Sequence, residues 1–425
     1  MVRKEYPKVG ETIAHAQLDN GLHIYVDQKP GFQKSYAFFA TCYGGMDMKF
    51  YLDGTWRDTP AGVAHFLEHK MFDTEDGNAL QILAANGASP NAFTSSAMTG
   101  YYFESTEKFY ENLKVLLSFV SIPYFTQESV DKEQGIIGQE IRMVEDDPDN
   151  QVFYALMESL FDHHPIQVSI AGTQESISHI TADTLYACHK AFYTPSNMVL
   201  TVAGDVDPER VVEIAREILP KDPGGRIERD YGGKETGTAA SSGKELRMEV
   251  STPIFQLGFK ADPAENGPER LRLQLLGTLA CEALLGNSSP LYAKLYRLGL
   301  INKNFGYGVE YYPGCALLAA GGESRDPAAV REAVLDEAAR IAREGVDESL
   351  FNRLKKGMYG ARVQGLNSFE NLCIELAQGH FAGFEFLSFP QAFESIQRRH
   401  VEEYLKAVVT PERCALAVVR PKEGA

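Results

Sequence analysis

The stretch TPAGVAHFLEHKMF, residues 59–72, places two imidazoles and a carboxylate in an otherwise mostly apolar segment. The Thr-Pro pair that opens it suits the cap and first turn of a helix, so the pattern predicts a helix beginning there. At about 100° per residue, His65, Glu68 and His69 lie on one face of that helix. Burying these groups without partners would be costly, and a metal ion bound by the two imidazoles removes that cost.

Histidines at positions i and i+4 of a helix are a standard ligand pair for a divalent metal ion. A glutamate one position before the second histidine gives the inverted form of the H-E-x-x-H arrangement. We therefore predict that His65 and His69 bind a metal ion and that Glu68 takes a proton from a water molecule beside it. A purely structural pair of histidines is the alternative.

A zinc site needs a third protein ligand, and the best candidates lie on a predicted helix over residues 130–144. Glu133 and Glu140 are two turns apart and fall on the same side as the apolar Ile137 and Ile141. Carboxylates on a buried stripe are unusual unless they are paired or bind a metal. One of them can therefore bind the metal while the other orients the site, and buried salt bridges are the alternative.

Composition narrows the class of protein. The 425 residues suffice for roughly two to three domains, and the formal charge of −17 argues against a protein that grips nucleic acid or an anionic membrane. No apolar run is long enough to span a bilayer, and the polar N-terminus does not resemble a secretory signal. Six cysteines without a C-x-x-C pair suit reduced thiols. We expect a cytoplasmic protein with neither nucleic-acid nor membrane partners.

The chain divides at a Gly/Pro/Ser-rich segment, which predicts an N-terminal lobe over 1–225 with the metal site, a linker over 226–245 and a C-terminal lobe over 246–425 without a metal motif. The lobes resemble diverged copies, because AFYTPSNMVLTVA (191–203) and AVVTPERCALAVV (407–419) both read as a helix end, a Thr-Pro turn and a strand. Irregular alternation of elements predicts an α+β fold. The N-terminal lobe is predicted to have strands over 22–26, 36–41, 100–104 and 199–202, and helices near 60–73, 76–87, 107–120, 128–146 and 151–161.

The sequence resembles the insulinase/pitrilysin family of zinc metallopeptidases, the peptidases with an inverted H-x-x-E-H motif. The resemblance covers nearly the whole chain and includes NAFTS at 91–95, GIIGQEI at 135–141 and NMVLTVAGDV at 197–206. It implies two homologous α+β lobes, each a mainly antiparallel sheet flanked by helices. It also implies one Zn²⁺ per chain, although the residues themselves do not distinguish zinc from manganese or cobalt.

The resemblance assigns the site residues one by one. His65, His69 and Glu140 correspond to the zinc ligands, Glu68 to the catalytic base, and Glu133 to a residue that orients the site from behind the ligands.

Family resemblance also implies a peptide substrate and a partner chain. Asn91 and Ala92 correspond to an edge strand that receives the substrate backbone by strand addition. Two pairs of lobes close like a clamshell in this family, so a chain of this length supplies one half and is expected to form a homodimer or a heterodimer. The family's second half carries an Arg followed seven residues later by a Tyr, whereas Arg297 and Tyr307 are ten apart here. A sister chain that supplies this pair is therefore expected.

The resulting hypothesis is a zinc-dependent endopeptidase or oligopeptidase. A non-catalytic assembly subunit of the same fold is one alternative. The segment GIIGQEIRM (135–143), followed by EDDP (145–148), is most similar to a bacterial cytosolic branch of the family. That branch is associated with the 5-aminopentanol modification of elongation factor P. A zinc hydrolase acting in that modification is the other alternative.

Overall fold

The computed structural model describes residues 1–422 and confirms the predicted α+β fold. Within these residues no helix is long and apolar enough to cross a membrane. The contacts within the chain define two compact units. Unit 1 comprises Met1–Ile141, Val168–Tyr231 and Val363–Leu387, and the rest of the described chain forms unit 2.

Unit 1 is built on a seven-stranded sheet in the order β1-β2-β3-β11-β4-β10-β9. Neighbouring strands are antiparallel except for β3 and β11, which are parallel. The strands are β1 (Val2–Tyr6), β2 (Glu11–Gln17), β3 (His23–Gln28), β4 (Ser35–Thr41), β9 (Ala88–Thr94), β10 (Thr99–Ser105) and β11 (Met198–Gly204). The four predicted strands are confirmed as β3, β4, β10 and β11.

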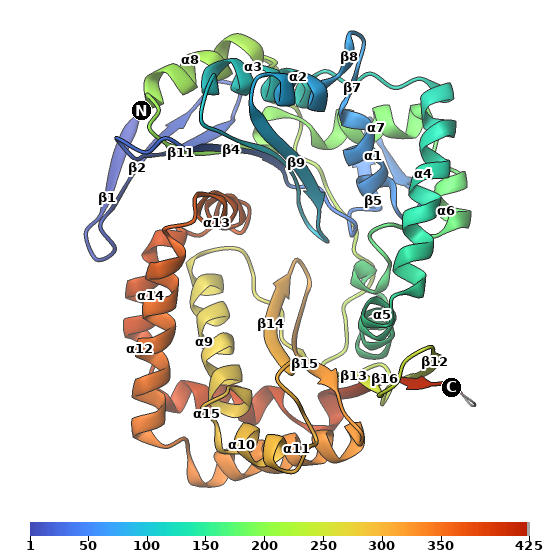
Figure 1. Cartoon of the computed structure of the whole chain (residues 1–425), viewed down its shortest axis with the longest axis vertical. Helices are drawn as coiled ribbons and strands as arrows, with labels where there is room; N and C mark the ends of the chain where they lie inside the picture. Colours follow the sequence, from blue (N-terminus) through green and yellow to red (C-terminus); the bar gives the residue numbers. More distant parts are fainter. Residues whose placement is uncertain (423–425) are drawn as a thin grey trace. The chain divides into compact units, whose positions relative to one another are not determined.

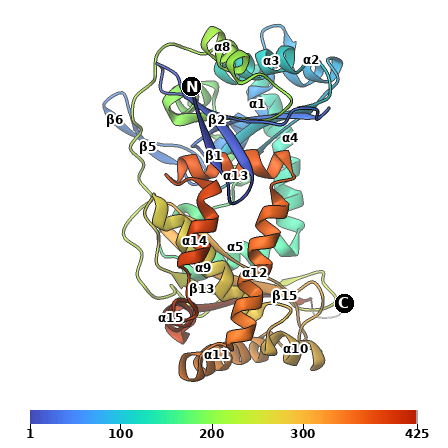
Figure 2. The ribbon, with the colours of Figure 1, turned by 90° about the vertical axis from the view of Figure 1, so that its left-hand side faces the viewer.

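Helices cover both faces of this sheet (Figure 1), with α3 and α8 on one side and α13 on the other. Figure 2 shows the same arrangement from a second direction. The helices that lie wholly or largely in unit 1 are α1 (Val63–Met71), α2 (Ala79–Ala85), α3 (Phe109–Ser121), α4 (Gln127–Asp146), α6 (Gln174–Ser178), α7 (Ala182–Phe192), α8 (Pro208–Ile218) and α13 (Phe369–Phe381). Two small hairpins complete the unit, β5 (Lys49–Leu52) with β6 (Thr55–Asp58) and β7 (Asp73–Thr74) with β8 (Gly77–Asn78).

Alternation along β4 explains why both faces are covered. Phe39 belongs to the main core under the helices, whereas Phe38 belongs to a second cluster that includes Phe369 and Cys373 of α13. Side chains of successive strand residues point to opposite faces, and all seven residues of β4 are buried. A central strand that is apolar on both faces requires a helix on each side.

Unit 2 has a sheet that repeats the order of five strands of unit 1, β3-β11-β4-β10-β9. Its five-stranded sheet runs β12-β16-β13-β15-β14, and only β12 and β16 are parallel, as β3 and β11 are. Its strands are β12 (Glu245–Met248), β13 (Ile254–Ala261), β14 (Gly306–Tyr312), β15 (Cys315–Glu323) and β16 (Cys414–Pro421). Its helices are α5 (Pro148–Leu160), α9 (Pro268–Leu285), α10 (Pro290–Arg297), α11 (Pro327–Glu344), α12 (Glu348–Gly365), α14 (Phe389–Ser395) and α15 (Arg398–Val408). The shared order supports the predicted duplication.

Each unit contains a helix from the other half of the sequence. After α4 the chain enters unit 2, where α5 packs on β13 and β16; after α12 it returns to unit 1, where α13 packs on β4 and β11. Gly258 of β13 permits the approach of α5, because a Cβ there would lie 2.8 Å from a Leu160 methyl group. The units therefore differ from the predicted lobes 1–225 and 246–425 at these two helices. Sequence composition marks exposed segments but does not reveal which sheet a helix covers.

The predicted linker over 226–245 is held by polar contacts at three of its residues, Arg229, Tyr231 and Glu235. Arg229 Nε lies 2.9 Å from Oδ1 of the buried Asp47, and the Tyr231 hydroxyl donates to the same oxygen at 2.8 Å. In unit 2, Glu235 pairs with the buried Lys260 at 2.6 Å. A segment poor in apolar residues is therefore fixed by ion pairs, which its composition does not reveal.

Candidate metal centre

Helix α1 carries the H-x-x-E-H motif and begins later than predicted. Its first residue is Val63, and Gly62 before it has a φ of 93°. A Cβ at Gly62 would lie 2.6 Å from the Ala171 carbonyl oxygen, so this turn requires glycine. The predicted Thr cap is wrong, because Thr59 Oγ1 donates to the Met48 carbonyl instead.

Two side chains of α1, His65 and His69, face one side chain of α4, Glu140. His65 Nε2 lies 3.6 Å and His69 Nε2 lies 3.5 Å from Oε2 of Glu140. Their side chains are 18%, 23% and 44% exposed, so the cluster is shielded yet reachable from solvent. Among the described residues, it is the one group of three or more His, Cys, Asp or Glu side chains whose ligand atoms all lie within 4.8 Å of one another.

One unpaired oxygen of this cluster fits a bound cation. Glu140 Oε2 is buried and has no hydrogen-bond donor within the described structure, although it faces two imidazole nitrogens. A buried carboxylate oxygen without a donor is costly. One cation in contact with all three side chains would satisfy it, and two imidazoles with a carboxylate are donors that zinc accepts.

The two histidines have different electrostatic environments. Burial, together with the neighbouring His69, lowers the pKa of His65 to about 4 and keeps its ring neutral. Burial also opposes protonation of His69, but a hydrogen bond to Glu133 and the carboxylates of Glu68 and Glu140 outweigh it and raise the pKa of His69. A metal ion that binds both rings must therefore displace a proton from His69 over part of the pH range.

Glu133 lies behind the cluster on α4 and is 16% exposed. Its Oε1 is 3.3 Å from His69 Nδ1, the nitrogen that faces away from Glu140. Burial raises the pKa of Glu133, but His69 and Lys70 outweigh this effect and lower it below the ordinary range. Of the two glutamates predicted on one face of this helix, Glu140 thus meets both imidazole Nε2 atoms and Glu133 contacts one ring from behind.

Glu68 lies on the same face of α1 as the two histidines, but its hydrogen-bond partner is on strand β9. It is 8% exposed, and its Oε2 accepts a hydrogen bond from Thr94 Oγ1 on β9 at 3.0 Å. Burial raises the pKa of Glu68, although His69 and Thr94 oppose the shift. A carboxylate with a raised pKa is suited to accept a proton and return it. The sequence reasoning missed Thr94, since a threonine in a strand shows no pattern that points to a distant helix.

Asn91 and Ala92 lie on β9, the outermost strand of the seven-stranded sheet. They pair with Tyr102 and Tyr101 of β10, and β9 has no neighbour on its other side in that sheet. An edge strand offers unpaired backbone groups that an extended peptide can join. The strand that carries Thr94 is therefore also the strand on which substrate binding is predicted.

The Arg/Tyr pair considered in the sequence lies in unit 2. Arg297 ends α10 and is exposed, whereas Tyr307 lies on the edge strand β14. Burial and the nearby carboxyl of Glu282 raise the pKa of Tyr307.

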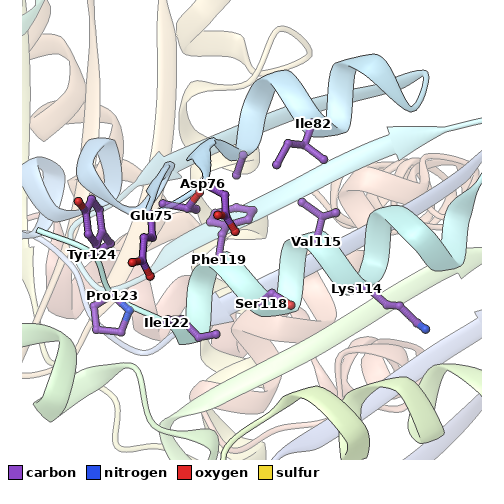
Figure 3. Close-up of a pocket in the computed structure, with 12 residues that line it drawn as sticks. Glu75, Asp76, Ile82, Lys114, Val115, Ser118, Phe119, Ile122, Pro123 and Tyr124 are labelled. Atoms are coloured by element: carbon purple, nitrogen blue, oxygen red, sulfur yellow. The ribbon is translucent and has the colours of Figure 1, made fainter.

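A separate hollow of about 470 Å³ in unit 1 contains none of the predicted site residues. Figure 3 shows side chains of α3 lining it together with the turn between β7 and β8. Its apolar residues include Ile82, Ile122 and Tyr124, all substantially exposed.

Comparison with known proteins identifies the family. Residues 54–174 match the insulinase model of peptidase family M16, and residues 179–358 match the peptidase M16 inactive domain. A Bacillus subtilis (strain 168) protein described as the uncharacterized zinc protease YmfH is 37% identical over 424 residues, covering 98% of this chain and 99% of that protein. The chain therefore belongs to the insulinase family, peptidase family M16.

Solved structures agree with this assignment. A putative M16-like peptidase from Alicyclobacillus acidocaldarius superposes with a TM-score of 0.93 at 31% identity, covering 99% of this chain and 100% of that one. A protease from Helicobacter pylori shares the fold, with a TM-score of 0.80 at 16% identity over 96% of this chain and 99% of that one. The finer similarity to the branch associated with elongation factor P stays a prediction.

Proposed function

We propose that this chain is a zinc-dependent peptidase that holds one metal ion on His65, His69 and Glu140. The observation that carries the proposal is the buried Glu140 oxygen, which faces two imidazole nitrogens and has no donor among the described residues. The name of the relative from Bacillus subtilis supports zinc as the metal.

Each residue around the cluster then has a separate role in peptide hydrolysis. Zinc, when bound, supplies a Lewis acid for the scissile carbonyl and lowers the pKa of water to around 7. Glu68 accepts the proton of the attacking water and returns it to the leaving amine, and its raised pKa suits both transfers. Thr94 holds the Glu68 carboxylate in place through its hydrogen bond. Glu133 fixes the ring of His69 from behind.

The substrate in this proposal is an extended peptide. Its backbone would add to the free edge of β9 beside Asn91 and Ala92, and the same strand bears the hydroxyl that contacts Glu68. Backbone pairing selects for extended conformation rather than for one side chain, so unfolded peptides are better substrates than folded proteins.

Glu68→Gln tests the proposal, because it keeps the shape of the side chain but removes the proton acceptor. We expect about one zinc per chain in the variant and a loss of peptide hydrolysis by a factor of about 10² or more. The exposed Glu128→Gln on the same unit makes the same chemical change away from the site and should retain wild-type hydrolysis. Wild-type rates in Glu68→Gln would refute the assigned role.

A non-catalytic assembly subunit is the second candidate, because residues 179–358 match an inactive domain and the Arg/Tyr spacing departs from the family pattern. We propose instead that the active form pairs with a second copy or with a sister chain that supplies this pair. Light scattering combined with peptide hydrolysis separates the two candidates. A zinc-loaded chain that hydrolyses no peptide, alone or with a sister chain, would favour the assembly role.

A further inference from the structure

Lys70 of α1 is a buried lysine directly after the metal-site histidine. Its side chain is only 2% exposed, and the residues of its helix outside the H-x-x-E-H motif are apolar apart from Lys70 itself. Lysine is almost never fully buried unless an acidic group pairs with it. The partners of Lys70 therefore indicate why this position carries a charge.

Two carboxylates hold the Lys70 ammonium group. Asp73, at the start of β7, pairs directly with Nζ. Glu133 Oε2 on α4 lies 3.6 Å from the same nitrogen. Lys70 thus connects the helix of the motif with the helix that brings Glu140 to the cluster.

The second oxygen of Glu133 faces the metal-site histidine. Glu133 Oε1 is 3.3 Å from His69 Nδ1, while His69 Nε2 points to Glu140 at 3.5 Å. When Nδ1 donates to a carboxylate, Nε2 is the nitrogen that keeps its lone pair for a metal. The orientation of Glu133 therefore determines which nitrogen of His69 faces the cluster.

His65 lacks such a support. Its Nδ1 is buried without a hydrogen-bond partner among the described residues. Both imidazoles face Glu140 through Nε2, but in the described structure only His69 also has a carboxylate at its Nδ1, and an ammonium group lies beside that carboxylate.

We propose that Lys70 is a positioning residue for the metal centre, which fixes Glu133 and through it the tautomer and orientation of His69. The inference rests on the proposed function, since it presupposes that His69 binds a metal. Within residues 1–422, Lys70 forms no hydrogen bond or ion pair with His69 or Glu140, so its effect on the metal must pass through Glu133.

A double-mutant cycle tests this route, with zinc affinity measured by competition with a chromogenic chelator. Lys70→Met removes the charge but keeps a side chain of similar length. We expect it to weaken zinc binding about 10–100-fold when Glu133 is present. In a Glu133→Gln background the same substitution should change the affinity by no more than about twofold. Lys132→Met removes an exposed charge next to Glu133 in the sequence and should leave the affinity unchanged.

Each outcome decides between the claims. A wild-type chain that binds no zinc would refute the proposed function itself. Wild-type affinity in Lys70→Met, or an equal loss with Glu133 and with Gln at that position, would overturn the positioning role. The visible spectrum of the cobalt-substituted protein, recorded for every variant, reports the ligand environment of the metal. Lys70→Arg should recover part of the affinity, because a cation again faces Glu133; no recovery would count against the charge as the cause.

Discussion

Replacing Glu140 by glutamine should abolish tight zinc binding without unfolding the protein. Glutamine keeps the shape of the side chain but replaces the only anionic member of the three-residue cluster. Structural zinc sites with four ligands are worth about 10–16 kcal/mol, or roughly 3 kcal/mol per ligand. Loss of one ligand then corresponds to an affinity about 100-fold weaker.

The structure separates this effect from loss of stability. In the metal-free protein, Glu140 Oε2 is buried without a donor, so the neutral amide should be tolerated as well as the carboxylate or better. At a zinc concentration about 100 times the wild-type Kd, bound metal stabilises the wild type by about 2.7 kcal/mol. A variant that binds about 100-fold more weakly gains only about 0.4 kcal/mol under the same conditions.

Two measurements on the same samples check this reasoning. Elemental analysis after dialysis gives the zinc content, and urea unfolding with and without zinc gives the stabilisation. Glu128→Gln, an exposed substitution on the same helix, should behave as the wild type in both. Wild-type zinc affinity in Glu140→Gln would refute Glu140 as a ligand, and a metal-free variant that is strongly destabilised would refute the account of its buried oxygen.

Three further predictions concern the surroundings of the cluster. Because the pKa of His69 is raised, zinc affinity should fall about tenfold per pH unit below that pKa and level off above it. Calorimetry in two buffers should detect the proton that His69 releases when zinc binds. Zinc binding without proton release near pH 6 would contradict the assignment of His69 as a ligand. Thr94→Val removes a hydrogen bond that lowers the pKa of Glu68, so the acidic limb of the kcat/KM profile should move up by about 1 pH unit. An acidic limb that does not move would exclude Thr94 as a residue that tunes Glu68. Gly62→Ala should lower the free energy of unfolding by about 1–3 kcal/mol, since φ is 93° and the added Cβ would lie 2.6 Å from a carbonyl oxygen. By contrast, Gly135→Ala, in a helix with no atom within 4 Å of the new Cβ, should be neutral or stabilising in the same urea titration.

The local pattern anticipated much of the candidate centre. Helical spacing alone places His65, Glu68 and His69 on one face, and two full turns place Glu133 and Glu140 together, whatever else the chain does. Both expectations are matched by α1 and α4. The start of α1 was not predicted, because it depends on a distant contact: Gly62, directly before the helix, lies against the Ala171 carbonyl group.

Duplication could also be read from the sequence, but the exchange of helices could not. The paired helix-turn-strand segments indicated two related lobes, and the five strands of unit 2 follow the order of five of the seven strands of unit 1. Neither composition nor periodicity indicated that α5 packs in unit 2 and α13 in unit 1. An apolar helix face shows that a helix is covered, but it does not show by which sheet.

By itself, the sequence determined which groups can act together within one helix and that the chain is an α+β protein of duplicated design. Only the tertiary structure decided that Glu140 meets the two imidazoles, that Thr94 holds Glu68, and that the charge of Lys70 is buried against Glu133. The physical reason is that spacing along a helix follows from local backbone hydrogen bonds, whereas the meeting of α1, α4 and β9 depends on the packing of the entire core.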